Sequence, residues 1–292
     1  MSIIDVNPEF EALLDYLKQA RGFDFTGYKR PSLIRRVQQR MQAIQIESYN
    51  DYINYIQINK QEFKHLFNTI EINVTNFFRD ELAWDYVVTQ VIGKIIAGKS
   101  ESEPIRVWSA GCASGEETYT LAIILAEALG VEQFCSRVRI YGTGVDKEAL
   151  NQAQLGSYVI NEIMGIPPTL LARYFEQTAH HYVFRKDLRR SIIFGCHNII
   201  ADPPMSQIDL LVCRNVLIYF NIEAQTRALA RFHFSLKRSG FLFLGKAEML
   251  PTHTNFFTPV DIKQRIFVKV PRGPSNQYQL VAALGRQKRL AK

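Results

Sequence analysis

The spacing of apolar residues changes along the chain, and the first part carries a helical spacing. Phe10, Leu13, Leu14 and Leu17 recur at intervals of three and four residues, which places them on one helix face. The same spacing continues in Tyr52, Ile53, Tyr55, Ile56, Phe63, Leu66 and Phe67. Residues 1–88 are therefore expected to form an all-α N-terminal domain. A linker helix over residues 81–97 and a polar stretch then lead to residue 104.

From residue 105 onward, short continuous apolar runs alternate with helical patterns, as they do in parallel sheets covered by helices. Strands are predicted over 105–108, 137–143, 191–196, 208–213, 240–245 and 264–270. This alternation predicts a doubly wound α/β domain over residues 105–270. Residues 176–193 are expected to form a small inserted β-hairpin. The basic tail, 271–292, lacks an apolar pattern and is expected to be flexible.

The segment IDLLVCRNVLIYFN, residues 208–221, places two polar residues where an apolar strand ends. In open α/β sheets, ligands bind outside the carboxyl ends of the strands. Arg214 and Asn215 are therefore expected to face a ligand cleft. The alternative is that the pair only caps a helix that begins near Val216.

A second segment, IRVWSAGCASGEETYTLAIILAEAL, residues 105–129, reads as a strand, a loop of small residues and a helix. The loop is not a P-loop, because no Lys-Ser or Lys-Thr follows Gly115. Glu116 and Glu117 at the start of the helix would repel a phosphate but attract a cationic ligand. S-adenosylmethionine, with its ammonium and sulfonium groups, is such a ligand. Alternatively, the two carboxylates only stabilise the helix N-terminus.

A third segment, EINVTNFFRDELAWDYV, residues 71–87, precedes the first strand and carries Asn73, Thr75 and Arg79. Phe77 and Phe78 lie between these polar residues and could anchor an irregular turn that exposes them. The alternative is a capped helix with the phenylalanines in the core and Arg79 in solvent.

In this order, the motifs NVTNFFRD, RVWSAGCASGEE and IDLLVCRNVLIYF resemble the chemotaxis receptor methyltransferase (CheR) family, over about residues 10 to 270. The resemblance implies a Rossmann-like class I S-adenosylmethionine-dependent methyltransferase domain with a small β-hairpin insertion, preceded by an all-α N-terminal domain. It also implies transfer of a methyl group from S-adenosylmethionine to glutamate side chains of chemoreceptors, with S-adenosylhomocysteine as the product.

The resemblance also assigns site residues. It implies that Arg79 and Tyr219 are catalytic. Tyr219 matches a tyrosine that the family often places beside the methyl group of the cofactor. The cofactor-binding residues that the resemblance implies are Asn73, Thr75, Arg79, Glu117, Asn198, Ile199, Arg214 and Asn215.

One departure from the family pattern lies after the second predicted strand. The family has Ser/Thr-Asp-Ile-Asp there, and the first acid can hydrogen-bond the cofactor ribose. This chain reads Thr143-Gly144-Val145-Asp146, so Gly144 replaces the first acid. Either Asp146, a water molecule or Glu117 takes over that contact, or cofactor affinity is lower than is usual for the family.

Length and composition agree with a cytoplasmic enzyme. The 292 residues suffice for two domains. No apolar run approaches the roughly 20 residues that a membrane helix needs, and the N-terminus lacks the pattern of a signal peptide. Cysteine and histidine spacing predicts no metal site. The cysteines are expected to be reduced thiols in the core: Cys112, Cys135, Cys196 and Cys213.

Basic residues crowd the helical domain, with Asp24 the only acid among them: Lys18, Arg21, Lys29, Arg30, Arg35, Arg36 and Arg40. Such a face suits an acidic partner, either nucleic acid or a glutamate-rich receptor helix, unless it is merely solvated. The family resemblance favours the receptor, with Arg35, Arg36 and Arg40 as the substrate-binding residues and with no nucleic acid and no membrane insertion.

Two other function classes stay open. A nucleic-acid methyltransferase is suggested by the basic balance and by Asp202-Pro203-Pro204-Met205, which resembles an adenine-methylase loop without its aromatic residue. A non-catalytic adaptor is suggested by the missing acid at Gly144. Residues 176–190 contain no glycine, which makes a hairpin edge less accessible to an added peptide strand. We therefore expect no dependence on a C-terminal tethering peptide of the receptor.

Overall fold

The computed structural model describes residues 7–71, 73–250 and 255–271. The chain divides into two compact units. The helical unit comprises the residues up to Asn73 together with Tyr219–Ala224, and the α/β unit comprises Val74–Ile218 together with the chain from Gln225 onward. The tail expected at 271–292 lies outside the described residues, apart from Pro271.

The helical unit contains α1 (Pro8–Arg21), α2 (Arg30–Ala43), α3 (Tyr49–Ile58) and α4 (Glu62–Ile70). The side chain of Asn7 caps α1 by accepting hydrogen bonds from the backbone of Glu9 and Phe10. Gly22 ends the helix in the left-handed region, with φ of 71°. The three-four pattern of α1 is buried as predicted: Phe10, Leu13, Leu14 and Leu17.

A segment distant in sequence completes the helical unit. Tyr28 and Phe220 form an isolated antiparallel bridge, and their rings lie 5.0 Å apart. The backbone N–H of Lys29 donates to the carbonyl of Tyr219 at 2.9 Å, and that of Asn221 donates to Gly27 at 2.9 Å. The helical unit therefore includes residues that follow the fourth predicted strand.

The α/β unit is built on a sheet of order β6-β2-β1-β7-β8-β10-β9. Its strands are β1 (Ile105–Ala110), β2 (Val138–Gly144), β6 (Ile192–Cys196), β7 (Ile208–Cys213), β8 (Leu236–Leu244), β9 (Phe257–Asp261) and β10 (Ile266–Lys269). The strands from β6 to β8 pair in parallel, while β10 pairs antiparallel with β8 and β9. The doubly wound sheet is confirmed, and β9 is an edge strand that the pattern did not reveal.

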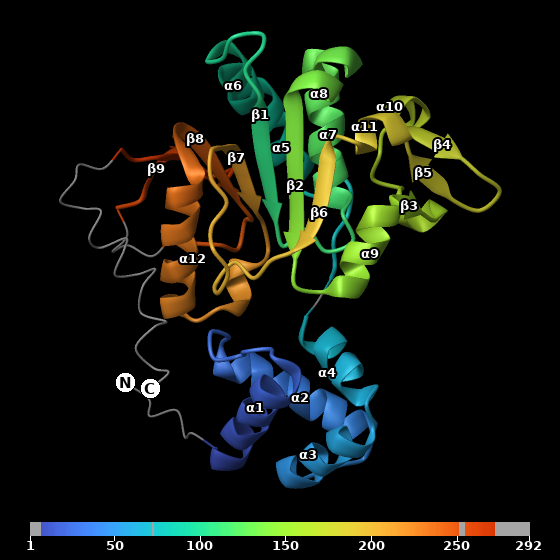
Figure 1. Cartoon of the computed structure of the whole chain (residues 1–292), viewed down its shortest axis with the longest axis vertical. Coiled ribbons are helices and arrows are strands. Elements are labelled where there is room, and N and C mark those ends of the chain that lie inside the picture. Colours follow the sequence, from blue (N-terminus) through green and yellow to red (C-terminus); the bar gives the residue numbers. More distant parts are fainter. Residues whose placement is uncertain (1–6, 72, 251–254, 272–292) are drawn as a thin grey trace. The chain divides into compact units, whose positions relative to one another are not determined.

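Helices cover both faces of this sheet (Figure 1). α12 (Ile222–Ser235) lies in front in that view, and α5 (Glu81–Tyr86) and α7 (Glu116–Leu129) lie behind. Leu210 and Val212 of β7 belong to the same buried cluster as Leu121 and Leu125 of α7. The remaining helices of the unit are α6 (Gly93–Ala97), α8 (Val131–Arg137), α9 (Lys147–Leu155), α10 (Pro168–Tyr174) and α11 (Lys186–Arg189), with short 3-10 turns at Ile160–Glu162 and Leu217–Tyr219.

The helix expected over 81–97 is interrupted. Between α5 and α6, residues Val87–Ile92 form a π-helix. Such segments are rare and occur frequently at functional sites. Apolar periodicity alone does not distinguish a π turn from an α turn, which is why one continuous helix was predicted.

The predicted hairpin is part of a small separate sheet of order β3-β5-β4, formed by β3 (Ser157–Tyr158), β4 (Phe175–Gln177) and β5 (Tyr182–Phe184). The turn between β4 and β5 is closed by the backbone N–H of Thr178, which donates to the carbonyl of His181 at 2.8 Å. Among the described residues no single helix meets the length and apolarity needed to cross a membrane, and the α7–α8 pair that passes together is bent by 118°.

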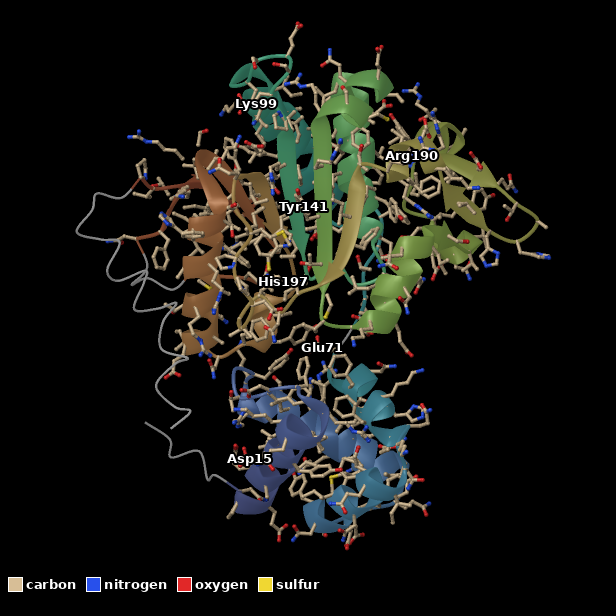
Figure 2. The ribbon with its side chains drawn as sticks, in the orientation of Figure 1. Asp15, Glu71, Lys99, Tyr141, Arg190 and His197 are labelled. Carbon is tan, nitrogen blue, oxygen red and sulfur yellow. The ribbon has the colours of Figure 1, made fainter. Side chains whose placement is uncertain are left out.

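The two ends of the main sheet differ in character. Lys99 and His197 lie at opposite ends (Figure 2). At the amino end, Lys99 pairs with Asp209 at 3.0 Å and with Glu103 at 2.9 Å, and Asp209 also accepts from the backbone N–H of Arg106. These contacts tie strands to their preceding loops. The carboxyl end carries the polar motifs.

Candidate functional site

The loop between β1 and α7 is shaped by two glycines with positive φ, Gly111 at 79° and Gly115 at 98°. The backbone N–H of Gly111 donates to the carbonyl of Thr143 at 2.7 Å, which fixes the loop to the end of β2. A Cβ atom at Gly111 would lie 2.4 Å from Cγ2 of Val216. Only glycine therefore lets this loop approach the residues that follow β7.

The residues after β7 are held by Glu248, a buried carboxylate. One oxygen accepts from the backbone N–H groups of Val216 and Leu217, both at 2.8 Å, and the other accepts from Gly245 at 2.5 Å. Asn215 has φ of 61°, a strained value that this bonding can maintain. Burial raises the pKa of Glu248, and these backbone donors oppose the increase.

Arg214 is the buried centre of the site. Its guanidinium donates to Asp80 at 2.6 Å and lies 3.8 Å from the carboxylate of Glu117. The group also stacks over Trp84 and Phe243, at 5.3 and 4.8 Å from the ring centroids. Arg214 therefore connects the NVTNFFRD motif, the strand end and the start of α7.

Glu117 lies at the carboxyl end of β1, where the Ser109 hydroxyl donates to it at 2.8 Å. Burial raises the pKa of the Glu117 carboxyl, whereas Arg214 and Ser109 oppose the increase. A carboxylate held in this way gains from a further positive charge. Lys246 pairs only with Asp80 among the described acids, at 2.8 Å, and Arg214 lies closer to Asp80, at 2.6 Å, than to Glu117, at 3.8 Å.

The donor set fits a cationic cofactor. Oδ1 of Asn215 is buried and accepts no hydrogen bond from any residue that the structure describes, so an acceptor is available after β7. Together with Glu117 it offers acceptors to an ammonium or a sulfonium group. The loop from Gly111 to Gly115 provides close backbone approach. These residues suit S-adenosylmethionine better than they suit a phosphate ligand.

The upstream motif divides between the two units. Asn73 belongs to the helical unit and is exposed, whereas Thr75 and Arg79 belong to the α/β unit and are half-buried. Arg79 donates to the carbonyl of Val74 at 2.9 Å. The backbone N–H of Phe78 donates to the Thr120 hydroxyl at 3.2 Å, which anchors the motif on α7.

At the end of β2, a Cβ atom on Gly144 would meet nothing closer than Leu150 Cδ2, at 3.9 Å. The position therefore has room for a side chain. Asp146 caps α9 by accepting from the backbone of Glu148 at 2.8 Å and of Ala149 at 3.3 Å. Its carboxylate has this structural role beside any contact with a ribose.

Asn198 follows β6 and closes a turn, because its Oδ1 accepts from the backbone of Ile200 at 2.9 Å. Ile199 is buried. Asp202, the first residue of the Asp-Pro-Pro-Met segment, accepts from the backbone N–H of Asn198 at 2.7 Å. This segment therefore stabilises the turn after β6.

Tyr219 and the three arginines proposed for the receptor belong to the helical unit. Arg40 forms a bidentate pair with the buried carboxylate of Glu62, at 2.7 and 2.8 Å, and Arg36 donates to the carbonyl of Thr69 at 2.8 Å. Arg35 is exposed and has no ion pair within the described part of the chain. Much of the apparent basic excess is thus neutralised by distant acids, including Glu11, which pairs with Arg30 at 2.7 Å.

The sequence analysis missed Asp80, Ser109 and Glu248. A signal existed for Glu248, since Gly245-Lys246-Ala247-Glu248 follows the carboxyl end of β8 directly. Within the described residues, no group of three or more His, Cys, Asp or Glu could hold a metal ion. Cys112 and Cys213 are free and buried, as predicted, and burial raises the pKa of the Cys213 thiol. The prediction of core thiols was wrong for Cys135, which is half-buried, and for Cys196, which is exposed at the end of the edge strand β6.

Comparison with known families and proteins matches both units. Residues 73–266 match the CheR methyltransferase, SAM-binding domain, and residues 8–70 match the CheR methyltransferase, all-alpha domain. The chain is 33% identical over 255 residues to an uncharacterized 104.1 kDa protein of Rhodobacter capsulatus, covering 87% of this chain but 27% of that protein. It is 29% identical to a chemotaxis protein methyltransferase of Listeria innocua, covering 87% and 98% of the two chains. With the chemotaxis protein methyltransferase of Escherichia coli, the identity is 29% and the coverage is 82% and 83% of the two chains.

Proposed function

The chain belongs to the CheR methyltransferase family, and on this premise we propose that it methylates glutamate side chains of chemoreceptors with S-adenosylmethionine as the donor. The observation that carries this proposal is the pair of acceptors, Glu117 and the unpartnered Oδ1 of Asn215, beside the buried Arg214. Membership of the family supports S-adenosylmethionine as the methyl donor. The two hydrogen-bond acceptors suit the ammonium and sulfonium charges of that molecule.

The proposed reaction needs little acid-base machinery. A glutamate side chain has an ordinary pKa of about 4.3, so at neutral pH it is already the nucleophile. S-adenosylmethionine supplies an electrophilic methyl group when bound. The work left to the protein is to bind, align and exclude water.

Individual roles follow from chemistry and geometry. Arg79 is held by Val74 through one nitrogen, and its remaining donors suit a carboxylate, either of the cofactor or of the incoming glutamate. Tyr219 is proposed to orient the methyl donor. Arg214, with its charge already shared by Asp80 and Glu117, is proposed to position Glu117.

The decisive experiment incubates the full chain with methyl-labelled S-adenosylmethionine and, separately, receptor cytoplasmic domains or nucleic acid. Labelling of the receptor that is released as methanol by mild base indicates a carboxyl ester. Label on nucleic acid alone would replace the proposal with the nucleic-acid reaction. Binding without transfer to either would favour the adaptor. Asn215→Ala should lose transfer, while Met249→Ala, at an exposed position, serves as the control.

We further propose that receptor helices are recognised through the helical unit, with Arg35 as a contact, and without a tethering peptide. The strands β3, β4 and β5 span two or three residues each, so the edge offered to an added peptide strand is short. Titration of the full chain with a receptor-tail pentapeptide should give no saturable binding at micromolar concentrations. Micromolar affinity would show that the small sheet is a docking site.

A further inference from the structure

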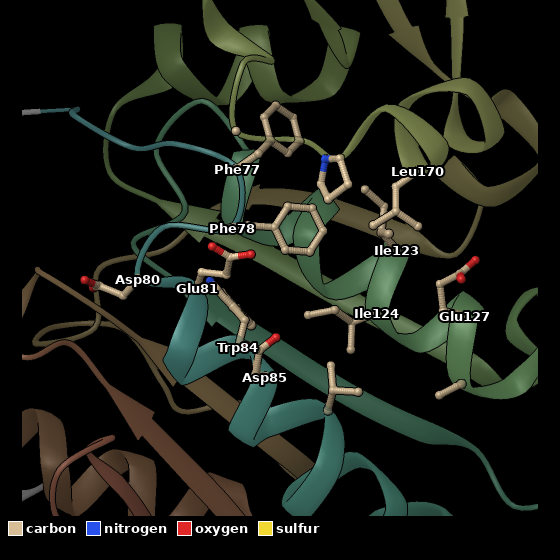
Figure 3. Close-up of a pocket in the computed structure, with 14 residues that line it drawn as sticks. Phe77, Phe78, Asp80, Glu81, Trp84, Asp85, Ile123, Ile124, Glu127 and Leu170 are labelled. Atoms are coloured by element: carbon tan, nitrogen blue, oxygen red, sulfur yellow. The ribbon is translucent and has the colours of Figure 1, made fainter.

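A cavity lies on the α7 side of the α/β unit, apart from the residues assigned to the cofactor. Its volume is about 630 Å³, which lies within the range of small-molecule sites. Thr75, Arg79, Glu117 and Asn215 are not among its lining residues. Most of its wall is apolar: Phe78, Trp84, Val88, Ile123, Ile124 and Leu170 (Figure 3).

The polar lining of this cavity carries one sign of charge. In the described part of the chain, four carboxylates and no Lys, Arg or His line the cavity: Asp80, Glu81, Asp85 and Glu127. Two of them are engaged elsewhere, since Asp80 pairs with Arg214 and Glu127 pairs with Arg173 at 2.6 Å. In Figure 3 the Asp80 carboxylate points away from the apolar side chains.

Glu81 and Asp85 remain available. Neither carboxylate has an ion pair or a side-chain hydrogen bond with any described residue. They stand four residues apart on α5, so they face the same side of the helix and repel each other. A positive charge placed between them would relieve this repulsion.

Trp84 closes the inner wall of the cavity. It is 2% exposed, and its ring lies 5.2 Å from the ring of Phe243 and 5.3 Å from the guanidinium of Arg214. Its contribution to the cavity is therefore apolar.

The wall of the cavity also has the local irregularities that accompany binding sites. Val88 belongs to the π-helix Val87–Ile92, and Phe78 and Asp80 adopt positive φ values of 50° and 63°. Arg79 lies between Phe78 and Asp80, so a ligand here would contact the backbone that carries it.

We propose that this cavity binds a small organic cation with an apolar body. The ammonium pairs with Glu81 and Asp85, and the body packs against Phe78, Ile124 and Leu170.

Three matched probes test the proposal on the full chain by NMR titration: tyramine, phenethylamine and 4-hydroxyphenylacetate. Tyramine and phenethylamine both carry the positive charge, with and without a hydroxyl group, and 4-hydroxyphenylacetate reverses the charge. Both cations are expected to bind at least tenfold more tightly than the anion. Equal binding of tyramine and 4-hydroxyphenylacetate, or no tyramine binding at millimolar concentration, would overturn the proposal.

Variants locate the binding. The double variant Glu81→Gln with Asp85→Asn should weaken tyramine about tenfold, whereas Glu101→Gln with Glu132→Gln, exposed carboxylates outside the cavity, should not change it. Ala128→Trp, which fills the cavity from an exposed position on its rim, should abolish binding while the melting temperature stays unchanged. Tyramine binding that survives both changes would place it elsewhere and refute the site.

Discussion

The guanidinium of Arg214 donates to the carboxylate of Asp80 at 2.6 Å, across 134 positions of sequence. Arg214 is buried and Asp80 is partly exposed, with side-chain exposures of 3% and 23%. Burial alone would raise the pKa of Asp80, but Lys246 and Arg214 outweigh it and hold this pKa below its ordinary value. The ion pair between Arg214 and Asp80 therefore connects the NVTNFFRD motif to the motif at the end of β7.

Asp80→Asn is expected to weaken cofactor binding, because Arg214 then loses its closest partner and turns towards Glu117. Removing one member of a fully buried ion pair costs about 3–5 kcal/mol. Because Asp80 is partly exposed, the expected loss of binding free energy is about 3 kcal/mol or less. Calorimetric titration with S-adenosylhomocysteine measures it. Lys246→Ala, which removes the exposed partner of Asp80, is the control and should have a small effect. Unchanged affinity in Asp80→Asn would limit the pair to a structural role.

Gly144→Asp is expected to increase cofactor affinity. The family pattern has an acid at this position, and a Cβ atom here meets only Leu150, at 3.9 Å. A charge-assisted hydrogen bond to a ribose contributes about 1.5–3 kcal/mol, or at least a tenfold lower Kd. Gly195→Asp, on the neighbouring strand with equal room, adds the same charge as a control. If both variants bind alike, the missing acid does not limit affinity.

Glu248→Gln is expected to reduce cofactor affinity about tenfold or more, which corresponds to about 1.4 kcal/mol. The amide cannot accept from Gly245 and from Val216 and Leu217 through two oxygens, so the loop that carries Asn215 loosens. Gly245→Ala should act in the same direction, since its Cβ would lie 2.9 Å from the backbone nitrogen of Asn215. Affinity measurements, combined with a thermal melt, separate loop displacement from unfolding. Normal affinity in both variants would contradict the positioning role.

Stability should fall as pH rises from about 4.5 to about 7 because of Glu116. Burial raises the pKa of this carboxyl to about 7 from 4.5, although the Ser114 hydroxyl donates to it. Between these values the folded chain holds a proton that the unfolded chain has lost, so the free energy of unfolding decreases by up to about 3 kcal/mol. Glu116→Gln should show a flatter profile from pH 5 to 8.5 by chemical denaturation. Parallel profiles would assign the pH dependence to other groups.

Arg35→Glu and Arg40→Glu should have different effects although both lie on α2. Arg35 is exposed, so its reversal should weaken receptor methylation through KM, and wild-type methylation should decline as salt rises. Arg40→Glu would place a carboxylate against the buried Glu62 and should lower the melting temperature of the helical unit. Methylation assays at several salt concentrations, paired with thermal melts, distinguish them. An active, salt-insensitive Arg35→Glu protein would show that this face is only solvated.

The strands of the parallel region could be located from sequence because each is a short apolar run, and β7 was predicted residue for residue at 208–213. β9 was missed because its segment contains Pro259 and only one buried residue, Phe257. The contacts of the site were harder to foresee. Asp80 meets Arg214, and Glu248 meets Val216, only after the chain has folded, and no local pattern encodes those pairings. Arg40 was predicted to bind the receptor for the same reason. Its ion pair with Glu62, which lies 22 positions away along the chain, has no local sequence pattern.

The bridge between Tyr28 and Phe220 means that the helical unit is not one continuous piece of chain. Lys29 and Gly27 hold Tyr219 and Asn221 through backbone hydrogen bonds, so the short segment from 219 to 224 is bound to the same unit as Arg35. A single genetic crossover after residue 73 would separate the two pieces. Exchange of the helical unit between relatives therefore requires two crossovers, and a hybrid made with one would inherit Tyr219 from one parent and its backbone support from the other.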